Sequence, residues 1–93
     1  MNSSCKIIEQ IMNLHILLEI ELRRISPNPN PFSVIMDYAK TLPSDKQEML
    51  SKIHCFRNQW AHATPTHPAP KLPENYKEWI AFLENEIALL KNN

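Results

Sequence analysis

Hydrophobic side chains recur every three or four residues along most of the chain, and prolines divide this pattern into four segments. The first segment covers about residues 4–25, with Ser3 or Ser4 as N-cap. Its inward-facing line is Ile8, Ile11, Met12, His15, Leu18, Leu22 and Ile25. A second line, three-quarters apolar, is Ile7, Leu14, Leu17 and Glu21. The spacing predicts a helix buried on more than one side, with a core face and a subunit contact.

The sequence PNPNP then interrupts the pattern at residues 27–31. Asn30 is suited to cap a short helix that has Pro31 at its first position. This second helix is predicted to run to about Leu42, because Pro43 follows it.

The third segment begins with the S-x-x-Q spacing of a capping box, formed by Ser44 and Gln47. A third helix is therefore expected to start at Asp45 and to end before Pro65. Its apolar face is predicted to be Met49, Ile53, Phe56 and Trp60.

The fourth segment predicts a helix from Pro73 or Glu74 to about Asn92. Its inward residues are Tyr76, Trp79, Ile80, Leu83, Ile87 and Leu90. No strand-like alternation and no internal repeat occurs in the sequence. The pattern therefore predicts an all-α, up-and-down four-helix bundle.

Composition adds a size and a class to this picture. A chain of 93 residues with 43% hydrophobic residues is expected to form one globular domain, residues 1–93. The absence of glycine and the presence of eight prolines mean that Pro, Asn, Ser and Asp must form the helix ends and turns. Ten basic and ten acidic residues cancel, so the net charge favours neither nucleic acid nor membrane as a partner.

Targeting and redox signals predict a cytoplasmic protein. The N-terminal sequence MNSSCKIIEQ lacks the apolar core of a signal peptide. The longest apolar stretch, IMNLHILLEI, is broken by Asn13, His15 and Glu19, so no membrane span is expected. Cys5 and Cys55, 50 residues apart, are expected to be reduced.

The chemistry of the chain is concentrated in CFRNQWAHATP, residues 55–65. On an ideal helix, Asn58 and His62 share a side nearly opposite the apolar face. Arg57 lies about 140° from His62 on the same wheel. Either the Arg57 side chain reaches round from the edge of the core face, or the helix loosens after Trp60.

These residue types suit phosphodiester cleavage without a metal. Arg57 presents a permanently charged fork that fits phosphate oxygens, and His62 can exchange a proton near neutral pH. The amide of Asn58 can orient a phosphate or the imidazole. His62 would activate or orient a ribose 2′-hydroxyl, and Arg57 would stabilise charge on the phosphoryl oxygens.

Structural explanations compete with this interpretation. His62 at a helix C-terminus can simply cap carbonyls and interact with the helix dipole. A zinc site could be assembled from Cys5, His54, Cys55, His62 and His67, although their spacing fits no common zinc motif. Cys55 could also pair with His62 as a nucleophile, or be a structural thiol. His15, alone on an apolar line, is expected to be a hydrogen-bonded core residue.

The six residues from Arg57 to His62 resemble the R-N-x-x-x-H signature of HEPN domains (higher eukaryotes and prokaryotes nucleotide-binding), in its R-N-x-W-A-H form. The all-α pattern and the motif at the end of the penultimate long helix agree with a HEPN-like bundle. The resemblance implies a metal-independent endoribonuclease that needs no cofactor. Arg57 and His62 would be catalytic and Asn58 would assist.

The resemblance further implies a homodimer in which two motifs form one composite site on an RNA substrate. The products would carry a 2′,3′-cyclic phosphate. Such a ribonuclease would suit a toxin or host-defence effector that an inhibitory partner protein restrains. The alternative function is a non-catalytic helical module for dimerisation or for RNA or protein binding, which the second apolar line of the first helix favours.

Overall fold

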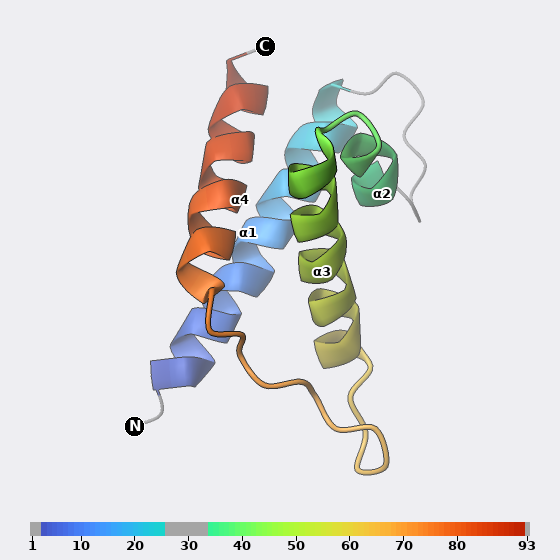
Figure 1. Cartoon of the computed structure of the whole chain (residues 1–93), viewed down its shortest axis with the longest axis vertical. Helices are drawn as coiled ribbons and strands as arrows, with labels where there is room; N and C mark the ends of the chain where they lie inside the picture. Colours follow the sequence, from blue (N-terminus) through green and yellow to red (C-terminus); the bar gives the residue numbers. More distant parts are fainter. Residues whose placement is uncertain (1–2, 26–33, 93) are drawn as a thin grey trace.

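The computed structural model describes residues 3–25 and 34–92, and they form four helices. The helices are α1 (Ser3–Ile25), α2 (Val34–Ala39), α3 (Ser44–Ala61) and α4 (Tyr76–Lys91). Figure 1 shows α1 and α4 side by side in the same direction, with α3 running the opposite way and the short α2 beside α1 and α3. The predicted all-α class is thus confirmed for the described residues. The predicted up-and-down order is not seen, because α1 and α4 run in the same direction and α2 has only 6 residues (Figure 1).

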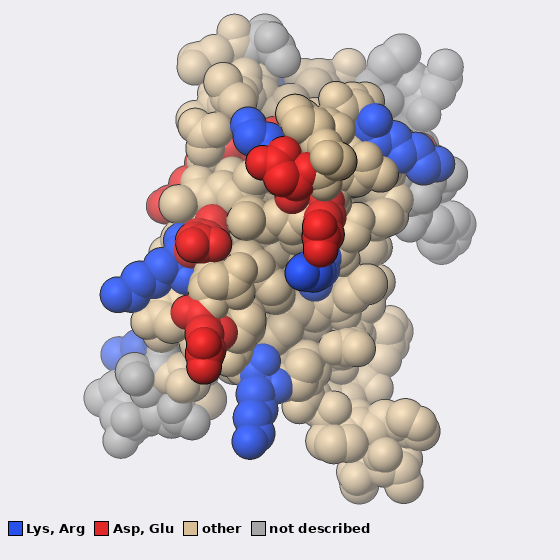
Figure 2. Space-filling view, viewed as in Figure 1, with Lys and Arg blue, Asp and Glu red and all other residues tan. Residues whose placement is uncertain are grey.

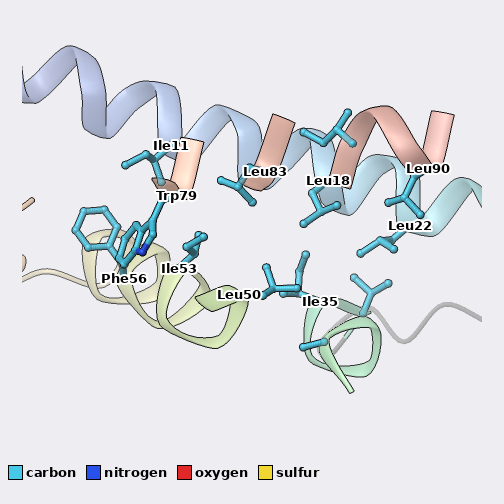
Figure 3. Packing of buried hydrophobic residues seen from close by; sticks show 13 residues of the cluster. Ile11, Leu18, Leu22, Ile35, Leu50, Ile53, Phe56, Trp79, Leu83 and Leu90 are labelled. Atoms are coloured by element: carbon cyan, nitrogen blue, oxygen red, sulfur yellow. The ribbon is translucent and has the colours of Figure 1, made fainter. Parts of the chain in front are cut away.

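The core lies between α1 and the other three helices (Figure 3). Its fully buried members include Ile11 and Leu18 of α1, Leu50 and Ile53 of α3 and Leu83 of α4. Aromatic packing closes the core at the end where α3 finishes and α4 begins. There the rings of Phe56 and Trp79 meet edge to face, with centroids 5.4 Å apart. The apolar faces predicted for the first, third and fourth helices therefore form most of the core, but Ile25, predicted to face inward, is 38% exposed.

The start of α3 differs from the prediction. The helix begins at Ser44, one residue early, and its N-cap is Pro43 rather than Ser44. The carbonyl of Pro43 accepts a hydrogen bond of 2.8 Å from the backbone N–H of Gln47. Because Ser44 already lies inside the helix, it does not act as the capping residue of a capping box.

The bounds of α2 and α4 also differ from the prediction. The observed α4 begins at Tyr76, after a turn in which the Tyr76 N–H donates to the Pro73 carbonyl. The described part of the second helix ends at Ala39, and a turn over residues 40–42 follows. The predicted cap at Asn30 and Pro31 lies outside the described residues.

The second apolar line of α1 is only partly covered. Ile7 and Leu14 pack against the core, but Leu17 is 44% exposed. Ile16 and Ile20 on the same helix are also exposed, at 44% and 54%. The back of α1 therefore presents apolar side chains to solvent in the isolated chain, as expected for a contact surface.

Charges are spread over the molecule. Figure 2 shows basic and acidic side chains interspersed on one face, with no continuous basic patch on the described part of that face. Among the described residues, no helix has the length and apolar character needed to span a membrane.

Candidate functional site

The candidate site occupies the last two turns of α3 and the loop that follows. The helix remains regular to Ala61, and His62 is its C-cap. The backbone N–H of His62 donates to the Asn58 carbonyl at 3.0 Å, whereas the imidazole makes no hydrogen bond within residues 3–25 and 34–92. The alternative in which this imidazole caps the helix carbonyls is therefore not what the structure shows.

A groove of about 600 Å³ runs along this end of the molecule. It is lined by Asn58, Gln59, His62, Thr66, His67, Pro68 and Pro70. His62 and His67 are both exposed, so two imidazoles are accessible to a ligand in this groove.

Two local interactions hold the loop wall of the groove. Thr64 and His67 exchange backbone hydrogen bonds of 3.0 and 3.1 Å across a turn that has Pro65 at its second position. Further along, Trp60 Nε1 donates to the Pro70 carbonyl at 3.1 Å. The motif tryptophan thus ties the proline-rich loop to the end of α3.

Arg57 contacts Asn58 but lies outside the groove. It is half-buried, does not line the groove, and its Nη1 donates to Asn58 Oδ1 at 3.4 Å. Because α3 stays helical to Ala61, the predicted loosening after Trp60 is wrong. The predicted reach of Arg57 round to His62 is not seen either, because the half-buried Arg57 side chain bonds Asn58 and does not line the groove.

Asn58 links the parts of the motif but does not simply face outward. It is half-buried, and its Nδ2 lies 3.3 Å from His54 Nε2, one turn earlier on α3. The prediction that Asn58 points away from the core is therefore wrong in part. Its amide bonds along the edge of the α1–α3 contact while still reaching the groove.

Behind Asn58, the ring of His54 meets the ring of His15 on α1, and the two rings lie nearly parallel. The ring centroids are 5.3 Å apart with an interplanar angle of 16°, and His15 Nε2 lies 3.1 Å from His54 Nδ1. His15 is fully buried, as expected for a hydrogen-bonded core residue. On its other side, Glu19 Oε1 lies 3.0 Å from His15 Nδ1, at ion-pair distance although not in hydrogen-bond geometry.

The surroundings of His15 and His54 favour the neutral form of both rings. Burial lowers the pKa of His15 from 6.5 to about 4, and the His54 and Arg57 charges add to this effect. Burial also lowers the pKa of His54; the Glu19 carboxylate opposes that shift and Arg57 reinforces it. At neutral pH each ring therefore carries one proton and offers one lone pair.

Sequence reasoning missed His54 and Glu19 as neighbours of the motif. One signal was available, because His54 lies four residues before Asn58 and so falls on the same side of the helix. The contact between His54 and His15 depends on how α1 packs against α3. The spacing of residues within either helix does not reveal that packing.

The alternative chemistries find little support in the geometry. No three His, Cys, Asp or Glu side chains lie close enough to hold a metal ion, at least among the residues that the structure describes. Cys5 and Cys55 are exposed and free, and Cys55 is not part of the groove that His62 lines.

Comparison with known proteins adds no assignment, because no family model, curated protein or solved structure matches this chain.

Proposed function

We propose that this protein is a metal-independent endoribonuclease of the HEPN type, with Arg57 and His62 as catalytic residues and Asn58 as their assistant. The observation that carries the proposal is the groove at the end of α3. Asn58 and the unbonded imidazole of His62 both line this groove, and Arg57 is hydrogen-bonded to that same Asn58.

His62 has the exposure that a proton-transfer group requires. Its imidazole is open to the groove and is not engaged by another described side chain. A phosphodiester lying in the groove would place its ribose 2′-hydroxyl within reach of the ring. His62 would take the 2′-hydroxyl proton or orient that hydroxyl, and the oxygen would attack the adjacent phosphorus. The bond between phosphorus and the 5′-oxygen of the next nucleotide would break, and that oxygen would take a proton from solvent, giving a 5′-hydroxyl on one fragment and a 2′,3′-cyclic phosphate on the other.

Arg57 supplies positive charge for the phosphoryl oxygens. The chain carries equal numbers of basic and acidic residues, and the loop wall of residues 61–70 contains no charged residue. RNA affinity must therefore come from local contacts at the groove rather than from a broad basic surface.

A homodimer explains the separation of Arg57 from the groove. Within one chain Arg57 does not line the groove that His62 lines. A second copy, placed with its α3 end against the first, would bring the partner's guanidinium to this imidazole. The composite site would work as a toxin or host-defence nuclease, held inactive by an inhibitory protein that covers the groove.

RNA cleavage in excess EDTA tests this proposal. Wild-type protein should cleave single-stranded RNA, and His62→Ala should lose about 10²–10⁴-fold in rate. Lys77→Ala, an exposed position on α4 outside the groove, is the matched control and should keep wild-type activity. A silent wild type, or a fully active His62→Ala variant, would contradict the proposal.

The exposed back of α1 favours a second candidate, a helical dimerisation module without catalysis. Ile16, Leu17 and Ile20 form this apolar surface. If dimerisation is the function, Ile20→Asp should yield monomers in analytical ultracentrifugation, and the wild-type dimer should show no ribonuclease activity. A wild-type monomer at high concentration would count against both candidates.

A further inference from the structure

A continuous line of polar contacts leads from the candidate site into the core. It passes from Arg57 through Asn58 and His54 to His15, and ends at Glu19. The successive distances are 3.4, 3.3, 3.1 and 3.0 Å. A positive charge stands at one end of the line and a carboxylate at the other.

The charges at the two ends determine the direction of every donor in the line. Arg57 can only donate, so Asn58 must turn its Oδ1 towards the guanidinium and its Nδ2 towards His54. His54 Nε2 then accepts from Asn58, and the single proton of the neutral ring lies on Nδ1. That proton points at His15 Nε2.

The same order follows from the other end. The Glu19 carboxylate near His15 Nδ1 favours the proton on that nitrogen, which leaves Nε2 as the lone pair that His54 needs. Reversing the line would place a lone pair against Glu19 and an amide N–H against Arg57. Both ends therefore select one arrangement, in which His15 and His54 are each protonated on Nδ1.

We propose that Glu19, His15 and His54 are positioning residues that hold the Asn58 amide in one orientation and, through it, the Arg57 guanidinium. This role rests on the proposed ribonuclease function. It also accounts for a costly feature of the core: a fully buried His15 where an apolar side chain would pack without polar requirements.

The surroundings of the pair are consistent with this assignment. The charged groups beside it are Glu19 on α1 and Arg57 on α3, and Arg23 Nη2 lies 3.6 Å from the second carboxylate oxygen of Glu19. The lowered pKa of both histidines keeps the rings neutral at pH 7, as the line requires. A second proton on His54 would turn an N–H towards Asn58 Nδ2 and break the order.

Nitrogen NMR of the wild-type protein tests the arrangement without any activity measurement. Long-range ¹H–¹⁵N spectra at pH 7 should show His15 and His54 neutral, each with its proton on Nδ1. His62 and His67, which are exposed, serve as internal references. A charged ring, or a proton on Nε2 of either buried histidine, would overturn the proposed order.

Kinetics of two variants test the positioning role. His54→Leu removes the acceptor for Asn58 and should lower kcat for RNA cleavage by about 10- to 100-fold with little change in KM. His54→Gln keeps a side-chain acceptor and should recover part of that loss. Cys55→Ser, at the neighbouring exposed position, should behave as wild type.

The outcomes separate the two proposals. If wild type and His54→Leu are both folded by circular dichroism and equally active, the positioning role fails and the ribonuclease proposal stands. If wild-type protein cleaves no RNA under any metal-free condition, both proposals fail.

Discussion

The rings of His15 on α1 and His54 on α3 lie nearly parallel, with their centroids 5.3 Å apart. This contact joins the hydrophobic core to residues 55–65, the segment that contains the candidate catalytic residues. His15 is completely buried, while His54 reaches Asn58 at the edge of the groove. The pair therefore connects the core to the candidate site through direct contacts.

The first prediction concerns stability in acid. Burial lowers the pKa of His15 from its ordinary value of 6.5 to about 4 in the folded protein, so between these values the unfolded chain binds a proton that the folded chain excludes. Falling pH consequently favours unfolding, and stability is lost progressively from about pH 6.5 to pH 4. The difference corresponds to up to about 3 kcal/mol in the free energy of unfolding.

Urea unfolding at pH 7, 5.5 and 4 measures this loss. His15→Gln should show a smaller decrease over the same range because it cannot titrate. His67→Gln removes an exposed histidine and should keep the wild-type decrease. Equal pH dependence in wild type and His15→Gln would rule out His15 as the source.

The second prediction concerns a charged residue inside the core. Glu86 is 1% exposed; its Oε1 accepts a 2.7 Å hydrogen bond from the Tyr38 hydroxyl, and its Oε2 has no partner among the described residues. Burial and this hydrogen bond to Glu86 raise the pKa of Tyr38. Tyr38→Phe would leave the carboxylate unpaired and should destabilise the protein by about 3 kcal/mol.

The double variant Tyr38→Phe/Glu86→Leu provides the comparison. With both polar groups replaced by apolar ones, its free energy of unfolding should return to the wild-type value or exceed it. Denaturant unfolding at pH 7 distinguishes the variants. A double variant less stable than Tyr38→Phe would show that the Glu86 carboxylate is needed for another reason.

The helices were largely predictable because their signals are local. The apolar spacing of α1, α3 and α4 places their buried faces correctly, and prolines mark the breaks between them. The N-cap of α3 was misplaced by one residue, because a Ser–Gln pair has the same spacing whether Ser44 precedes the helix or begins it. Glu86 was not predicted to be buried, since its partner Tyr38 comes from a distant segment.

The candidate site was predictable only in part. Its residue types and the exposure of His62 follow from the sequence and from the end of α3. The orientation of Asn58 does not, because the buried face of α3 is broader than the predicted line. Leu50 is fully buried and extends the core towards His54 and Arg57. The histidine contact across α1 and α3 is a tertiary feature that neither helix encodes alone.

The third prediction concerns the tryptophan of the motif. Trp60→Phe keeps an aromatic ring in place but removes the Nε1–H that donates to the Pro70 carbonyl. The variant should lose about 1 kcal/mol of stability, and the loop over residues 64–70 should become easier to cleave by proteases. Limited proteolysis with mass spectrometry locates the cut. Protection equal to that of wild type would show that this hydrogen bond does not hold the loop.

The fourth prediction concerns the composite site. Arg57→Ala and His62→Ala should each reduce RNA cleavage by at least about 10²-fold. If one site uses Arg57 of one protomer and His62 of the other, a mixed dimer of the two variants contains one complete pair. Co-expression with two affinity tags isolates that mixed dimer, and its activity should rise well above that of either variant alone. A mixed dimer as inactive as its parents would place both residues of the site in the same chain.

RNA cleavage by attack of the 2′-hydroxyl leaves characteristic product ends, and the chemistry of these ends distinguishes it from other mechanisms. Wild-type protein is incubated in EDTA with an RNA oligonucleotide and with its fully 2′-O-methylated counterpart, and the products are analysed by mass spectrometry. Attack by the 2′-hydroxyl should give fragments with a 2′,3′-cyclic phosphate from the first substrate and no cleavage of the second. Fragments with a 3′-hydroxyl and a 5′-phosphate, cleavage of the methylated strand, or intact RNA would contradict it.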